Sequence, residues 1–133
     1  MSKLFTVIIP LLVMLILSNG FAEEANVNLS KLNDGLIMAV KSDHEGLQLS
    51  AMMLIIKHSD KVKVSQLAND IYQIYSSHEN DRFRQLALVT LHKMNNRRIL
   101  RNLVFDIDSE TNPVIRHQMA TILKKMPPMS AGY

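Results

Sequence analysis

The sequence from about residue 29 to residue 126 predicts an all-α fold. Apolar residues recur there at intervals of three and four, which is the spacing of one face of an α-helix. Residues that interrupt helices are few, and the main ones are Gly35, Gly46, Pro113 and the pair Pro127–Pro128. No stretch shows the sustained alternation of apolar and polar residues that marks a half-buried strand. We therefore expect helices and no sheet.

The chain begins with the pattern of a cleavable secretory signal. Lys3 precedes an apolar run from Leu4 to Leu17, and the small residues Gly20 and Ala22 follow it. A run of this length fits a signal peptide, whereas a membrane span needs roughly 20 apolar residues. We expect cleavage after Ala22 and a mature domain that is exported, either periplasmic or secreted. An uncleaved anchor is the alternative, and it is the only route to membrane contact that the sequence offers.

Three helices are expected in the first half of the mature chain. The first, over 29–41, is weak because it contains Gly35, and glycine inside a helix costs about 1 kcal/mol relative to alanine. Asp43 is expected to cap a second helix that runs to about residue 58. An apolar stripe that includes Val64 and Tyr75 predicts the third over 62–76.

Three more helices are expected in the second half. Asn80 or Asp81 begins a fourth that ends near residue 94, and a fifth spans about 97–105. Asn112 followed by Pro113 is a strong start for a sixth, because proline suits the first helical turn. The proline pair at 127–128 ends that helix.

These expectations divide the chain into four parts. Residues 1–22 form the signal peptide, and 23–42 form an N-terminal segment with a capping helix. Residues 43–126 form the helical repeat domain, and 127–133 form a flexible tail.

A repeat runs through the predicted helices. An offset of 32 residues aligns Asn80 with Asn112 and Arg84 with Arg116, and an offset of 36 aligns Ala51 with Ala87. Leu47, Phe83 and Ile115 occupy one further repeat position. Self-similarity with a period in this range is typical of stacked helix pairs, because one pair cannot bury its apolar faces alone.

These motifs resemble HEAT repeats, in which an apolar residue and an arginine precede a small residue. The segments that carry the resemblance are Phe83-Arg84-Gln85-Leu86-Ala87 and Pro113-Val114-Ile115-Arg116, within 43–126. Gln48 departs from the pattern where an arginine is expected, and Met119 replaces the small residue. The resemblance implies a short α-solenoid of about three HEAT-like helix pairs. Arg84 and Arg116 would be its structural arginines, whose heads bond an acid or a carbonyl in a neighbouring turn.

Several kinds of chemistry find no support in the sequence. The chain contains no cysteine, which excludes disulfides, thiolate metal sites and a cysteine nucleophile. Its five histidines lack metal-ligand spacing. The acidic turn from Asp106 to Glu110 is too short for a calcium loop. Because no catalytic motif is visible, we expect no enzyme, no cofactor and no metal.

One charged cluster is a candidate site. Residues 23–81 hold five Lys and nine Asp or Glu, a net −4, whereas 82–133 hold nine Lys or Arg and three acids, a net +6. Arg82, Arg97, Arg98 and Arg101 fall on the predicted fourth and fifth helices. They are candidates for binding an acidic partner or an anion, and the alternative is a solvated surface. The methionines of the repeat domain, Met53 among them, are expected to fill the core.

Together these observations predict an exported helical-repeat scaffold or adaptor that binds another protein, with self-association as a further expectation. The alternative is an anion- or ligand-binding module that uses the arginine cluster. Binding of nucleic acid is not expected of an exported protein.

Overall fold

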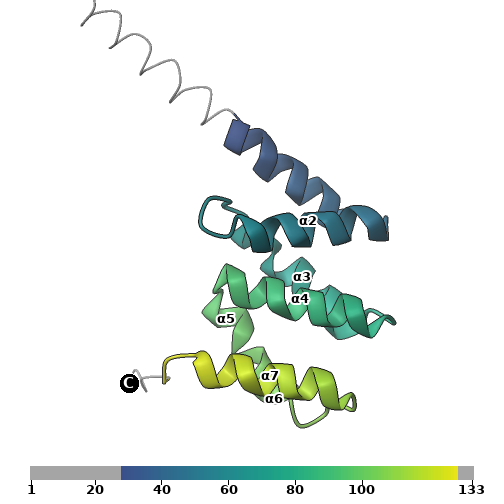
Figure 1. Ribbon diagram of the computed structural model, residues 1–133, viewed down its shortest axis with the longest axis vertical. Coiled ribbons are helices and arrows are strands. Elements are labelled where there is room, and N and C mark those ends of the chain that lie inside the picture. The colour runs from purple at the N-terminus through teal and green to yellow at the C-terminus, as the bar shows by residue number, and fades with distance from the viewer. Residues whose placement is uncertain (1–27, 129–133) are drawn as a thin grey trace, which may run out of the picture.

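A computed structural model describes residues 28–128 of the chain. These residues are helical with connecting turns, and none of them lies in a strand (Figure 1). The all-α prediction is therefore confirmed for this part of the chain. The predicted signal at 1–22, residues 23–27 and the tail at 129–133 lie outside the described residues.

The elements follow one another with short connections. A helix over 28–41 comes first. The others are α2 (Glu45–Lys57), a 3₁₀ turn η1 (Ser65–Leu67), α3 (Ala68–Ser77), α4 (Asp81–Met94), α5 (Arg97–Leu100), α6 (Asn102–Asp106) and α7 (Pro113–Lys125).

Two of the predicted helix starts are confirmed. The side chain of Asn80 accepts a hydrogen bond from the N–H of Arg82, and that of Asn112 accepts from Val114 and Ile115. Each asparagine thus satisfies a backbone donor that the first turn leaves free. The predicted cap of the second helix was wrong, because His44 rather than Asp43 accepts from the N–H of Leu47.

The third and fifth helices differ from their predictions. The third begins at Ala68, six residues later than expected, because Val64 is buried from a non-helical segment and its apolar side chain imitates a helical stripe. The fifth divides at Arg101 into α5 and α6. Asn95 ends α4 in the left-handed conformation, with φ 51°, which asparagine tolerates better than most residues.

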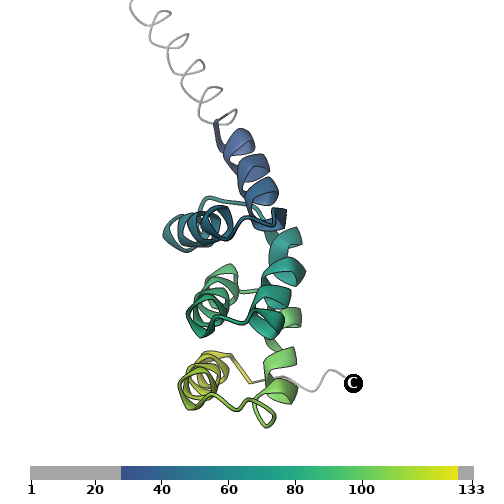
Figure 2. The same ribbon diagram turned by 90° about the vertical axis from the view of Figure 1, so that its right-hand side faces the viewer.

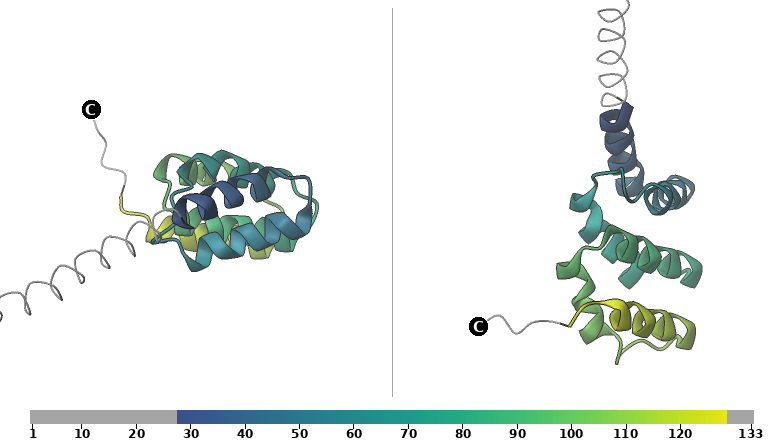
Figure 3. Two further views of the ribbon diagram at one scale, coloured as in Figure 1. Left: turned by 90° about the horizontal axis from the view of Figure 1, so that it is seen from above. Right: turned by 60° about the vertical axis from the view of Figure 1, so that its left-hand side comes forward.

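The helices form two columns. One column holds α2, α4 and α7, which lie one below another and run in the same direction (Figure 1). The other holds α3, α5 and α6 (Figure 2). Helix 28–41 leads down to the first layer at a steep angle, and the layers below it lie over one another when seen from above (Figures 2 and 3). We call the side where α2, α4 and α7 begin the start edge, and the side where they end the end edge.

One continuous core runs through the stack. It includes Leu36 and Val40 of the first helix, Ile71 of α3, Leu88 of α4 and Met119 of α7. Helix α4 contacts α2, α3 and α7, so it is the central element of the packing.

Candidate binding surfaces

The start edge carries three side chains at one repeat position, and each donates to a backbone carbonyl in the last turn of the preceding helix or in the connection before its own helix. Gln48 Nε2 donates to the carbonyl of Ser42 at 2.8 Å and to that of Val40 at 3.2 Å. Arg84 Nε donates to Tyr75 at 2.8 Å, and Arg116 Nε donates to Glu110 at 2.9 Å. Carbonyls at the end of a helix lack partners within it. The three side chains therefore fasten each turn to the helix that follows, and Gln48 takes the place of an arginine.

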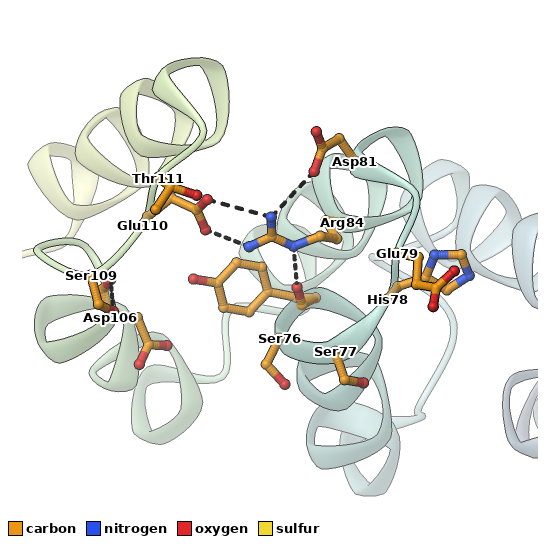
Figure 4. A pocket seen from close by; sticks show the side chains of 11 residues that line it. Ser76, Ser77, His78, Glu79, Asp81, Arg84, Asp106, Ser109, Glu110 and Thr111 are labelled. Carbon is orange, nitrogen blue, oxygen red and sulfur yellow. Dashed lines mark hydrogen bonds and ion pairs between the residues drawn. The ribbon is translucent and has the colours of Figure 1, made fainter.

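Arg84 makes a second connection, across two layers (Figure 4). Its guanidinium donates to both carboxylate oxygens of Glu110, which lies in the turn before α7, and to Asp81 Oδ1 at 3.3 Å. Glu110 is buried. A carboxylate out of water needs such a partner, and the planar fork of arginine matches it with two parallel hydrogen bonds.

The electrostatics of this pair favour the charged forms. Burial acts to raise the pKa of Glu110, but the hydrogen bonds from Arg84 and from the N–H of Asn112 outweigh it and hold that pKa below its usual value. Burial acts to lower the pKa of Arg84, but Glu110 and Asp81 outweigh it and raise that pKa. Both groups are therefore ionised at neutral pH.

Further polar contacts close the same joint. Asn112 Nδ2 donates to Asp81 Oδ2 at 2.7 Å. The hydroxyl of Tyr72 donates to Asp106 Oδ2 at 2.6 Å, and burial together with this bond raises the pKa of Tyr72 to about 12. We call this network, with Arg84 and Glu110 at its centre, the polar joint.

An open pocket of about 400 Å³ adjoins the polar joint (Figure 4). Its wall is polar, with Ser76, Ser77, His78, Glu79 and Ser109 among the lining residues. Both serine hydroxyls donate to the carbonyl of Gln73.

The histidine of this wall is already engaged. His78 Nδ1 accepts from the N–H of Asn80 at 3.0 Å, Nε2 lies 3.3 Å from Glu45, and the ring stacks on Phe83 at 4.4 Å. A general base needs a free nitrogen within reach of a proton to be moved. Both ring nitrogens of His78 already have partners, so this side chain helps to hold the pocket wall in place.

Residues 28–128 hold no group of three His, Asp or Glu side chains placed to bind a metal ion. None of the helices within these residues is both long enough and apolar enough to span a membrane.

The four candidate arginines do not lie together. Arg97, Arg98 and Arg101 are exposed on or beside α5, at the end edge. Arg82 is exposed at the first turn of α4, at the start edge. Along α4, about 17 Å separate Arg82 from Lys93, given a rise of about 1.5 Å per residue.

The end edge gathers many more basic residues than the predicted cluster. Because α2, α4 and α7 all end on this side, their terminal lysines join those of the loop after α2 and the arginines of α5 (Figure 1). We call these nine exposed residues the basic edge: Lys57, Lys61, Lys63, Lys93, Arg97, Arg98, Arg101, Lys124 and Lys125. Within residues 28–128 none of the nine forms an ion pair.

The positive charges of the basic edge affect the pKa of a neighbouring side chain, that of His92. Burial lowers the pKa of His92, and the positive charges of Lys125 and Lys93 lower it further. These two lysines belong to α7 and α4, so the charges of consecutive layers act on one point. Part of the basic edge has a simpler role, since lysines in the last turn of a helix offset its dipole.

The upper face of α2, the face turned away from α4, is apolar and exposed. Leu47 and Leu54 lie one turn to either side of Ser50, and 49% and 39% of the two leucines is exposed. At the matching positions the exposed fractions are 8% for Phe83 and 0% for Thr90 in α4, and 0% for Ile115 and 4% for Ile122 in α7. In α4 and α7 these positions are buried, and each of the two helices contacts the helix of the preceding layer. Helix 28–41 covers α2 incompletely as a cap and leaves this face open.

Two features of these surfaces escaped the sequence analysis. Met53 was expected in the core, but it is 57% exposed on α2. The sequence places Glu110 only in an acidic turn and does not predict its burial or its pairing with Arg84. The repeat offered a signal for it, since an arginine at the position of Arg84 calls for an acid in an adjacent turn.

No family model, no curated protein and no solved structure matches the chain.

Proposed function

We propose that this protein is a small exported scaffold of about three HEAT-like helix pairs, arranged as a short α-solenoid, that binds another protein. Its task is recognition through a surface, with no catalytic step. The signal pattern of residues 1–22 supports export. The matching contacts of Gln48, Arg84 and Arg116 support a repeated unit.

The observation that carries the proposal is the open upper face of α2. Stacked repeats bury each layer against the next, and terminal layers need a polar outer face to stay soluble alone. The upper face of α2 has Leu47 and Leu54 instead, at positions that are buried in both later layers. A partner that covers these two leucines would complete the stack at this end.

Site-specific photo-crosslinking tests this proposal. A photoreactive residue replaces Leu54 in the tagged full chain, produced in a host that exports it, and replaces Phe105 in a matched control. Phe105 is 80% exposed on α6, so the control offers an apolar position at the other end of the stack. We expect a defined crosslinked protein from position 54 that position 105 does not give. Absence of any product specific to position 54 would contradict the proposal.

The basic edge favours a second function, the binding of an anionic partner. Nine exposed cations that form no ion pair within residues 28–128 give a positive surface along the end edge. Such surfaces attract polyanions with strong dependence on salt. This candidate replaces the predicted arginine cluster by a larger set that excludes Arg82.

A charge-reversal comparison tests the second function. Arg97→Glu with Arg101→Glu should abolish retention of the full chain on an immobilised sulfated polysaccharide at low salt. Arg82→Glu is compared with Arg97→Glu alone as the matched pair, because each reverses one exposed arginine and Arg82 lies at the other end of α4. Equal loss in the two single variants would show a general charge effect and would remove the basic edge as a site.

A further inference from the structure

We propose that the partner of the upper face of α2 is a second copy of this chain, docked antiparallel about a two-fold axis near Ser50. This inference rests on the proposed function, because it names the partner of the same surface. It depends on three properties of α2: the spacing of its leucines, the size of the residue between them and the charges at its ends.

The spacing makes the upper face complementary to itself. Leu47, Ser50 and Leu54 lie at positions i, i+3 and i+7, which fall on one side of a helix. In an antiparallel pair centred near Ser50, Leu47 of one copy lies opposite Leu54 of the other, and the reverse contact follows by symmetry. A two-fold interface requires such mutual contacts.

The residue at the centre permits close approach. Ser50 is small and exposed, and its hydroxyl donates to the carbonyl of Gly46 at 2.8 Å within its own helix. It therefore brings no unsatisfied hydrogen-bond donor into an apolar contact. A long side chain at this position would hold the two helices apart.

The end charges select the antiparallel orientation. Asp43 and Glu45 lie at the start of α2, whereas Lys57 and Lys61 lie at its end or just beyond it. An antiparallel pair brings the acidic end of each helix to the basic end of the other, and the helix dipoles are opposed as well. A parallel pair would bring like charges together.

The lower end of the stack makes head-to-tail stacking less favourable. In α7, the position that matches the buried Met52 and Leu88 is occupied by exposed Ala120, flanked by Arg116 and Lys124. This lower face is small and basic, so it offers the leucines of α2 little apolar area. A second upper face, by contrast, offers the leucines of α2 an apolar surface of matching shape, with Leu47 and Leu54 at the matching spacing.

Sedimentation of charge-swapped chains tests the proposal. The full chain, in the form in which the exporting host yields it, is compared with Leu54→Glu, Asp43→Lys and Lys57→Glu, and circular dichroism confirms that each variant is folded. We expect a reversible dimer whose dissociation constant rises about a hundredfold for Leu54→Glu, which puts a charge against an apolar surface. Asp43→Lys alone and Lys57→Glu alone should each raise it about tenfold, because each puts like charges at both ends of the interface.

Mixing the two charge variants is the decisive step. An equimolar mixture of Asp43→Lys chains and Lys57→Glu chains pairs opposite charges at both ends, so we expect a heterodimer as tight as the original dimer. A mixture that stays monomeric would overturn the antiparallel dimer. Phe105→Glu is the control and should leave the dimer unchanged.

The crosslink from position 54 separates this inference from the proposed function. A product that joins two α2 segments of separate chains supports the dimer. A product with another protein, with no dimer in sedimentation, overturns the dimer and supports the scaffold. A product within one chain, to residues outside 28–128, overturns both, because the chain then covers its own face.

Discussion

Helix α7 contacts α4, its side chains Ile115 and Ile122 are buried, and the polar joint closes the adjoining edge. On α2, Leu47 and Leu54 hold the same positions in the repeat, yet both remain exposed. The comparison shows that similar sequence positions make one face of each helix apolar but do not decide what packs against that face. In one case a neighbouring layer of the same chain supplies the contact. In the other, the contact must come from elsewhere.

The largest effect is expected when the side chains at equivalent positions of α4 and α2 are truncated to alanine. Phe83→Ala should lower the free energy of unfolding by about 4 kcal/mol, because a buried aromatic ring leaves a cavity. Leu47→Ala, at the matching position, should cost less than about 1 kcal/mol, because much of its side chain is already in water. Urea denaturation at a concentration where the chain is monomeric measures both. Equal losses would show that α2 is packed on this face after all.

Removal of the charge at the polar joint should have the next largest effect. Glu110→Gln leaves the guanidinium of Arg84 without its main counter-charge, and breaking a buried pair from one side costs about 3 kcal/mol. Asp108→Asn is the control, since Asp108 is exposed in the same turn. Denaturation of the two variants should differ clearly, and a Glu110→Gln chain as stable as the control would mean that the pair contributes no net stability.

Removal of a helix N-cap should have a smaller effect on stability, and the effect should be larger for α7 than for α2. Asn112→Ala removes a side chain that accepts from two backbone N–H groups and also donates to Asp81. It should cost at least about 1 kcal/mol in thermal unfolding. His44→Ala should cost less, because His44 accepts from Leu47 alone, at a long 3.3 Å, in an exposed position. The reverse ranking would contradict the greater importance of the lower joint.

Acid should weaken the polar joint selectively. The pKa of Glu110 in the folded chain lies below its usual 4.5, so its stabilising effect is complete above that value and is lost as the pH falls through the folded pKa. The difference in unfolding free energy between the natural chain and Glu110→Gln should therefore shrink in acid. A difference that stays constant from neutral pH into acid would argue against this assignment.

The sequence predicted the helix starts better than the surfaces. The N-caps Asn80 and Asn112 could be predicted because an N-cap is a local interaction between a side chain and the next turn. The start of α3 was not, since the buried Val64 continues the apolar pattern outside the helix. Helix α2 is apolar on nearly all sides, so its pattern does not separate the buried Met52 from the exposed Met53.

The distribution of charge shows the same limit. Counting along the chain divides it into an acidic first part and a basic second part. In space the bases of both parts, such as Lys57 and Lys93, meet at the end edge because α2 and α4 end on the same side. Only the direction in which each helix runs decides this grouping, and that direction is a tertiary property.

Glu110 also has a consequence for the order in which the chain takes shape. A ribosome delivers the N-terminal part of a chain first, and Glu110 follows Arg84 by 26 residues. The residues of α4 therefore leave the ribosome before Glu110 does. Of the hydrogen-bond partners that Arg84 has in the finished structure, Asp81 and the carbonyl of Tyr75 are made before Glu110. The ion pair that joins α4 to the turn before α7 can therefore form only after the last turn of the stack has been made.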